Sequence, residues 1–140
     1  MIDFDAAWRH LQQTTKAPDD CQRWNKKAAR YDSRDAKNLY AEAFVELARV
    51  QPGETVFDMG CGTGSLALPL ANEGVNVVAC DLSSGMLGKL REQAEADGVI
   101  DNLDIRKVSW LDSWEDLPVA DVFFASRSLF SRDLRETLLK

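Results

Sequence analysis

Histidine and cysteine are scarce in this sequence, which holds one histidine, His10, and three cysteines, Cys21, Cys61 and Cys80. A metal site with two histidine ligands is therefore excluded, and Ser–His–Asp chemistry would depend on a single imidazole near the N-terminus. The cysteines are odd in number and lack the spacing of metal ligands, so a disulfide framework and a zinc cluster are both disfavoured. We expect no metal ion in this protein.

Long apolar runs and an excess of basic residues are also missing. No run approaches the roughly 20 residues that cross a bilayer, and residues 1–5 lack the basic start of a signal peptide. With 17 basic and 23 acidic residues the net charge is −6, which works against binding to phosphate backbones or anionic lipids. The composition predicts a cytoplasmic protein that binds neither nucleic acid nor membranes and whose partner is a small molecule.

What is present is enough apolar sequence for one folded domain, because 45% of the 140 residues are hydrophobic and domains of about 100–150 residues are common. Apolar residues at helical spacing predict three helices, within residues 4–11, 24–31 and 39–47. Trp24 and Tyr31 lie in the second of these, where the spacing favours packing in the core over contact with a ligand. We therefore expect residues 1–50 to be helical.

From residue 55 onwards, strand-like and helix-like segments alternate. Runs typical of strands cover residues 55–59, 75–80, 103–108 and 120–125, and helical patterns occur at 65–73, at 83–97 and after Ser131. Pro69 lies inside the first of these helical patterns and is expected to distort it, because proline has no N–H to donate. The alternation predicts an α/β fold with an open, doubly wound, mostly parallel sheet in residues 51–140, within a single domain.

A glycine-rich turn directly follows the first predicted strand. Gly60, Gly62 and Gly64 remove three β-carbons and allow positive φ, so that a ligand can lie against the main chain beside a helix N-terminus. Asp81 ends the next predicted strand, 17 residues beyond Gly64, where an acidic side chain can accept both hydroxyls of a ribose. Because ligands of doubly wound sheets bind beyond the carboxyl ends of the strands, these features predict an adenosine-like ligand.

Asp58, near the end of the first predicted strand, distinguishes two kinds of adenosine ligand. The stretch from Gly62 to Ala67 also satisfies the loose dinucleotide pattern G-x-G-x-x-G/A, so an NAD-dependent oxidoreductase is an alternative. A pyrophosphate beside Asp58 would be repelled, at about 4 kcal/mol for like charges ~4 Å apart at an effective dielectric constant of about 20. A cationic ligand would be attracted instead, and S-adenosylmethionine carries an ammonium and a sulfonium.

Residues 56–64, Val-Phe-Asp-Met-Gly-Cys-Gly-Thr-Gly, resemble the first motif of class I S-adenosylmethionine-dependent methyltransferases, D/E-x-G-x-G-x-G. Residues 78–87 are similar to the second motif of that family, whose acid binds the ribose and whose next apolar residues pack on the adenine. The resemblance implies a Rossmann-like methyltransferase fold and S-adenosylmethionine as the cofactor. The cofactor-binding residues that it implies are Asp58, Gly60, Cys61, Gly62, Thr63, Gly64, Asp81, Leu82, Met86, Trp110, Leu111 and Ser126.

The resemblance also implies a function, the transfer of a methyl group from S-adenosylmethionine to a small-molecule acceptor. Displacement at an activated sulfonium mainly requires that the acceptor is placed in line and that water is excluded, so no catalytic base is assigned. Residues 24–28 resemble the helix that many small-molecule methyltransferases fold over the cofactor, which makes residues 1–50 a lid and a first covering helix. A non-catalytic cofactor-binding or assembly module is a second alternative.

Members of this family usually have seven strands, whereas four are predicted here. Either the sequence is a fragment of a longer protein, or it is a shortened domain whose fourth strand is an open edge. In the second case residues 122–125 would present unpaired backbone and apolar side chains to water. We then expect a second copy of the chain to cover that edge in a homo-oligomer.

Overall fold

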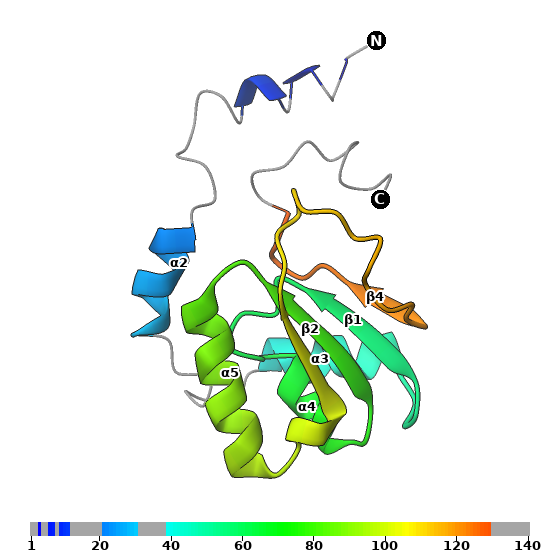
Figure 1. Cartoon of the computed structure of the whole chain (residues 1–140). Coiled ribbons are helices and arrows are strands. Elements are labelled where there is room, and N and C mark those ends of the chain that lie inside the picture. Colours follow the sequence, from blue (N-terminus) through cyan, green and yellow to red (C-terminus); the bar gives the residue numbers. More distant parts are fainter. Residues whose placement is uncertain (1–2, 4–5, 8, 12–20, 31–38, 130–140) are drawn as a thin grey trace.

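The computed structural model of the chain describes residues 3, 6–7, 9–11, 21–30 and 39–129. Its centre is a sheet of four strands, β1 (Thr55–Met59), β2 (Asn76–Asp81), β3 (Leu103–Lys107) and β4 (Val122–Phe124). The strands are parallel throughout and lie in the order β3-β2-β1-β4 (Figure 1). The predicted α/β fold with a mostly parallel sheet is therefore confirmed. Tyr31 and the helix predicted after Ser131 lie outside the described residues.

The described helices are α2 (Cys21–Ala28), α3 (Leu39–Ala48), α4 (Ala67–Asn72) and α5 (Ser84–Asp97), followed by the short 3₁₀ helix η1 (Ile100–Asn102). Helix α5 begins and ends where local chemistry predicts. The Ser83 hydroxyl accepts a hydrogen bond from the Met86 N–H, and Gly98 ends the helix in the left-handed conformation at φ 72°. Both ends are thus determined by the nearby sequence.

Pro69 does not distort a helix, because α4 begins later than predicted. The helix starts at Ala67, so Pro69 lies in its first turn, where a backbone N–H has no helical partner to donate to. The preceding residues form turns instead, and the Leu68 N–H bonds to the carbonyl of Gly64 at 2.9 Å. The expected loss of a hydrogen bond is therefore avoided by shortening the helix.

Alternate residues of the strands pack against two different layers. On one face Val56, Val77 and Ala79 share a buried cluster with residues of α3, α4 and α5. On the other face a second cluster joins residues of β1 and β2 to the connection between β3 and β4, chiefly to Trp110 and Trp114. Within the described ranges this second face is covered by an irregular, aromatic segment, where a doubly wound sheet usually has helices.

Strand β4 is less open than predicted. Phe124 is buried and meets the ring of Phe44 edge-on, with 4.9 Å between centroids. Phe123 is about half exposed, yet it stacks on Phe57 at 5.4 Å. The expectation that β4 turns its apolar side chains to water is therefore wrong for Phe124 and only partly right for Phe123.

None of the helices that the structure describes is long and apolar enough to span a membrane.

Candidate functional site

A cavity that is open to solvent lies at the carboxyl end of the sheet. The connections diverge here, because α4 and α5 lead from β1 to β2 and β3, whereas β4 pairs with the other side of β1. Such a reversal of strand order is where ligands bind in doubly wound sheets. The residues that line the cavity are Trp24, Met59, Gly60, Asp81, Leu82, Val108, Ser109, Trp110, Arg127 and Ser128.

The three glycines of the turn after β1 all have positive φ, but the space around their Cα atoms differs. A β-carbon on Gly60 would lie 2.3 Å from the Ser128 β-carbon, and one on Gly64 would lie 2.4 Å from a Leu90 methyl group. Gly62 is different, because a β-carbon there would meet no atom within 4 Å. Gly60 and Gly64 therefore allow close packing, and Gly62 leaves open space beside the main chain.

Asp81 ends β2 with both carboxylate oxygens held by main-chain donors. Oδ2 accepts from the Gly62 N–H at 2.9 Å, and Oδ1 accepts from the Ser83 N–H at 2.8 Å. The side chain lines the cavity although it is only 8% exposed. These two N–H groups fix the carboxylate at the edge of the cavity, where it can meet a ligand.

Asp58 lies deeper, on the neighbouring strand, and is 2% exposed. Its Oδ2 atom is buried without a hydrogen-bond partner among the described residues. Burial, together with the nearby charge of Asp81, raises the pKa of Asp58 from 3.8 to about 7. A cation close to Asp58 would stabilise the charged carboxylate, whereas an anion would destabilise it further.

Three side chains that lie between Asp58 and Asp81 in the sequence, Cys61, Thr63 and Cys80, are buried as well. Burial, followed by the charges of Asp58 and Asp81, raises the pKa of the Cys61 thiol well above its usual range, and burial raises that of Cys80 to about 12. Neither thiol is therefore suited to act as a nucleophile near neutral pH. Thr63 is 3% exposed, and its hydroxyl has no hydrogen-bond partner in the described part of the chain.

Eight of the twelve predicted site residues are absent from the cavity wall, and three of these eight also lie outside Asp58 and the glycine turn. Leu111 is 76% exposed, and its N–H donates to the Ser109 hydroxyl. The Ser126 hydroxyl shares a 2.7 Å hydrogen bond with the Tyr40 hydroxyl. Met86 is buried in the first turn of α5 and is absent from the cavity wall. The cavity thus includes Gly60, Asp81, Leu82 and Trp110 from the prediction, with the rest of the glycine turn beside it.

Other residues of the cavity wall were not predicted as site residues. Trp24 was expected to pack in the core, but it lies in the wall contributed by α2. Arg127 has φ 53°, and its guanidinium lies 4.1 Å from the centroid of the Tyr40 ring. The hydroxyl of Ser128 is buried and has no hydrogen-bond partner among the residues that the structure describes. The only available signal was that residues 126–128 directly follow a strand of the sheet.

Comparison with known proteins then identifies the family. Residues 56–140, more than half of the chain, match the family described as "Methyltransferase domain". The chain belongs to this family. The resemblance of this methyltransferase domain to class I S-adenosylmethionine-dependent methyltransferases is thereby confirmed, and S-adenosylmethionine is the cofactor of that class. The matches give no support to the alternative of an NAD-dependent oxidoreductase.

Individual relatives are longer than this chain. An uncharacterized protein of Haemophilus influenzae is 39% identical over 124 residues, which cover 84% of this chain and 44% of the relative. Demethylmenaquinone methyltransferase of Beutenbergia cavernae is 38% identical over 68 residues, 44% of this chain and 28% of that enzyme. The chain thus spans less than half the length of these relatives.

Solved structures show the same fold. TrmN from Thermus thermophilus aligns with a TM-score of 0.57 and 29% identity, covering 71% of this chain and 30% of that one. An RNA methyltransferase from Salinibacter ruber, crystallised with S-adenosylhomocysteine, aligns with a TM-score of 0.56 and 24% identity, covering 63% of this chain and 57% of that one. Both support the Rossmann-like methyltransferase fold.

The prediction of a small-molecule partner and no nucleic acid is wrong. A 23S rRNA (uracil(1939)-C(5))-methyltransferase of Dechloromonas aromatica is 37% identical over 54 residues, and the release factor glutamine methyltransferase of Cereibacter sphaeroides is 38% identical over 71 residues. The acceptors named for these relatives include nucleic acid and protein. The prediction failed because net charge is an average over the chain, whereas an acceptor is recognised by the local surface at its site.

Proposed function

We propose that this methyltransferase domain binds S-adenosylmethionine in the cavity, and that the whole protein transfers a methyl group from it. The observation that carries this proposal is the pair of buried carboxylates on neighbouring strands. Asp81 is held by two main-chain N–H groups, while Asp58 has a buried oxygen without a described partner. The residues fit the group, because a ligand with an adenosine and positive charges complements both acids.

The proposal gives the residues around the cavity distinct tasks. Asp81 accepts the ribose hydroxyls, and Leu82 and Trp110 provide apolar surface for the adenine. Gly62 keeps the main chain accessible, and Asp58 supplies negative charge beneath the turn. The cofactor supplies a methyl group that is already activated on a sulfonium, so the protein has to position the acceptor and exclude water.

The acceptor is left unassigned, and so are the residues that contact it. Relatives with comparable identity are named for quinone, porphyrin, rRNA and protein substrates. The fold alone does not decide the reaction either, since the [4+2]-cyclase SpnF aligns with a TM-score of 0.62 at 22% identity, covering 77% of this chain and 44% of that one. The methyl transfer proposed here therefore depends on the family match and the cavity.

Calorimetric titration with S-adenosylhomocysteine and with NAD tests the binding step. We expect S-adenosylhomocysteine to bind and NAD not to bind, because Asp58 opposes a pyrophosphate. Asp81→Asn should weaken binding by about 1–3 kcal/mol, since an amide replaces one acceptor with a donor that faces main-chain N–H groups. Asp101→Asn, the same substitution at an exposed residue in η1, is the matched control and should leave the affinity for S-adenosylhomocysteine unchanged.

The opposite result would refute the proposal directly. Binding of NAD, or unchanged affinity in Asp81→Asn, is incompatible with the assigned site. Turnover is measured separately, as release of S-adenosylhomocysteine by the full-length protein with candidate small-molecule, RNA and protein acceptors. Tight cofactor binding without any turnover would instead support the non-catalytic module.

A further inference from the structure

The side chain of Asn25 fastens helix α2 to the turn that follows Asp81. Its Oδ1 atom accepts one hydrogen bond from the Ser83 hydroxyl at 2.6 Å and another from the Gly85 N–H at 2.9 Å. Next to it, the Cys21 thiol donates to the carbonyl of Leu82 at 3.1 Å. One amide thus joins a helix near the N-terminus to residues that lie 58 and 60 positions further along the chain.

Ser83 connects Asn25 to the carboxylate at the end of β2. Its main-chain N–H donates to Asp81 Oδ1 at 2.8 Å, and its hydroxyl oxygen accepts from the Met86 N–H at 3.2 Å as the cap of α5. A hydroxyl has a single proton, so donating that proton to Asn25 leaves the lone pairs of the oxygen for the cap. Asn25 therefore orients the residue that holds one oxygen of Asp81.

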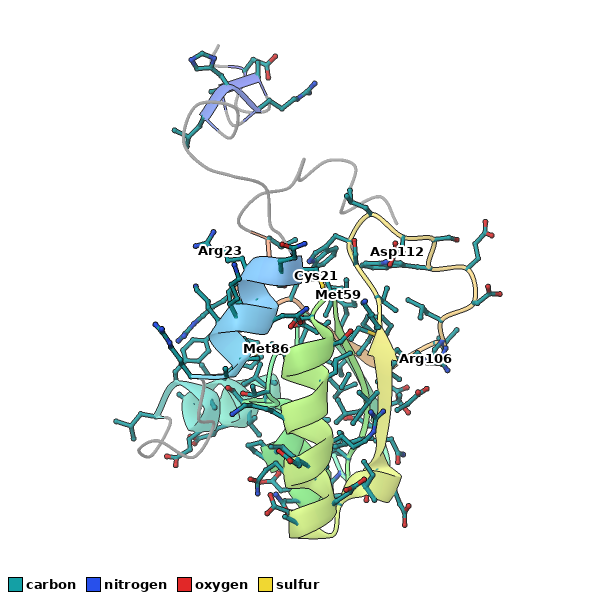
Figure 2. All side chains as sticks on the ribbon, turned by 60° about the vertical axis from the view of Figure 1, so that its left-hand side comes forward. Cys21, Arg23, Met59, Met86, Arg106 and Asp112 are labelled. Carbon is teal, nitrogen blue, oxygen red and sulfur yellow. The ribbon has the colours of Figure 1, made fainter. Side chains whose placement is uncertain are left out.

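Helix α2 also approaches α5 closely at this point. A β-carbon on Gly85 would lie 3.2 Å from both the Ala28 β-carbon and Asn25 Oδ1, so α2 would have to give by a few tenths of an ångström to accommodate one. Ala28 is 3% exposed, which shows that the two helices pack tightly. Figure 2 shows α2 lying over the first turn of α5, with Met86 at the junction.

The neighbour of Asn25 in the sequence faces the cavity. Trp24 belongs to the same wall as Asp81 and Leu82, and the ammonium of Lys27 lies 4.5 Å from the centroid of its ring. Any shift of α2 away from α5 would move this indole out of the wall. The position of Trp24 thus depends on the bonds that Asn25 makes.

We propose that Asn25 is a positioning residue for the cofactor, which ties α2 to the turn after Asp81 and so holds Trp24 in the wall of the adenosine pocket. The inference rests on the proposed function, and it adds a residue that lies outside the first motif, residues 56–64, and the second motif, residues 78–87. Because docking of α2 and binding of the cofactor share one turn, each favours the other to the same degree. Asn25 touches neither the cavity nor the reacting atoms, and it acts through Ser83 and Trp24.

The test compares two substitutions of Asn25 by calorimetric titration with S-adenosylhomocysteine. Asn25→Ala removes both acceptor bonds and should weaken binding roughly tenfold. Asn25→Asp keeps an oxygen for Ser83 and Gly85 and should restore the affinity to within about threefold of the wild type. Arg23→Ala is the matched control, because Arg23 is exposed on the same helix, and its affinity should be unchanged.

Two further measurements separate positioning from a general loss of stability. Methylthioadenosine, which lacks the amino-acid end of the cofactor, should lose the same factor in affinity as S-adenosylhomocysteine, because Asn25 acts on the adenosine end. Thermal unfolding is recorded for each variant, and titrations are made well below its midpoint. A variant that is merely less stable would then bind both ligands normally.

A pair of glycine substitutions keeps the proposal testable if Asn25→Ala does not fold. Gly85→Ala adds a β-carbon that α2 can accommodate only by giving a few tenths of an ångström, and it should weaken binding several-fold, whereas Gly88→Ala, whose β-carbon would meet nothing within 4 Å, should not. Normal affinity in a folded Asn25→Ala or in Gly85→Ala, or no rescue by Asn25→Asp, overturns the inference while the proposed function stands. Failure of the wild type to bind S-adenosylhomocysteine overturns the proposed function itself.

Discussion

The buried carboxyl of Asp58 makes the stability of the protein depend on pH at a single residue. Its pKa is raised from 3.8 to about 7, first by burial and then by Asp81. Between these two values the folded protein retains a proton that the unfolded chain has lost. The resulting stabilisation is complete below about pH 4 and is lost as the pH rises through about 7.

Urea unfolding of the wild type and of Asp58→Asn at pH 5 and pH 8 measures this dependence. The wild type should lose on the order of 2–4 kcal/mol more than the variant over that interval, because the amide does not titrate. Groups remote from Asp58 titrate equally in both proteins, so the difference reports Asp58 together with its interaction with Asp81. Saturating S-adenosylhomocysteine should reduce the loss, since its ammonium favours the charged carboxylate. Identical pH profiles for the two proteins would show that Asp58 does not carry the effect.

At the scale of the helices and strands, the sequence predicted the bounds of an element where residues at its own ends determine them. Strand β1 was predicted with its observed bounds, and the helical pattern at residues 83–97 predicted α5, which the structure shows capped by Ser83 and ended by Gly98. The start of α4 was predicted too early, because the apolar pattern extends into a segment that the glycine turn keeps out of the helix. Periodicity alone does not report such competition between a turn and a helix.

Predictions for the candidate site also depended on residues that lie close together in the sequence. Asp58, Asp81 and the glycines could be singled out because they occur at fixed spacing around strand ends. Trp24 and Ser128 were not among the predicted site residues, because their place in the wall arises from contacts between distant segments. A helical period explains a core position and a cavity position equally well, so the spacing alone does not decide between the two for Trp24.

Two glycine substitutions can separate the effect of backbone strain at positive φ from the effect of blocking the ligand at the glycine turn. Gly62 and Gly74 both have positive φ, 57° and 82°, and a β-carbon would meet nothing within 4 Å at either. Gly62→Ala and Gly74→Ala should therefore destabilise the fold by a similar amount, about 1–2 kcal/mol. Only Gly62→Ala should also weaken binding of S-adenosylhomocysteine, because its methyl group enters the open space by the turn. Equal affinities in the two variants would mean that the ligand does not lie there.

For the whole molecule, the described part of the sheet is supported unequally on its two faces. Helices α3, α4 and α5 pack on one face, whereas the connection between β3 and β4 covers the other. The ring of Trp114 joins that connection to the sheet, with centroid distances of 5.9 Å to Phe57, 5.1 Å to Trp110 and 6.0 Å to Phe123. Its Nε1 also donates to the carbonyl of Ser109 at 3.3 Å.

Trp114→Ala should accordingly lower the free energy of unfolding by about 2–4 kcal/mol, toward the lower end of large-to-small substitutions because the indole is half-buried. Trp114→Phe keeps an aromatic ring but loses the hydrogen bond, so about 1 kcal/mol should be lost. Urea unfolding measures both, with Val119→Ala as a control at a side chain that is 94% exposed in the same connection. Since Trp110 packs on Trp114 and lines the cavity, the alanine variant should also bind S-adenosylhomocysteine more weakly. A Trp114→Ala protein as stable as the control would show that this face of the sheet does not depend on the aromatic cover.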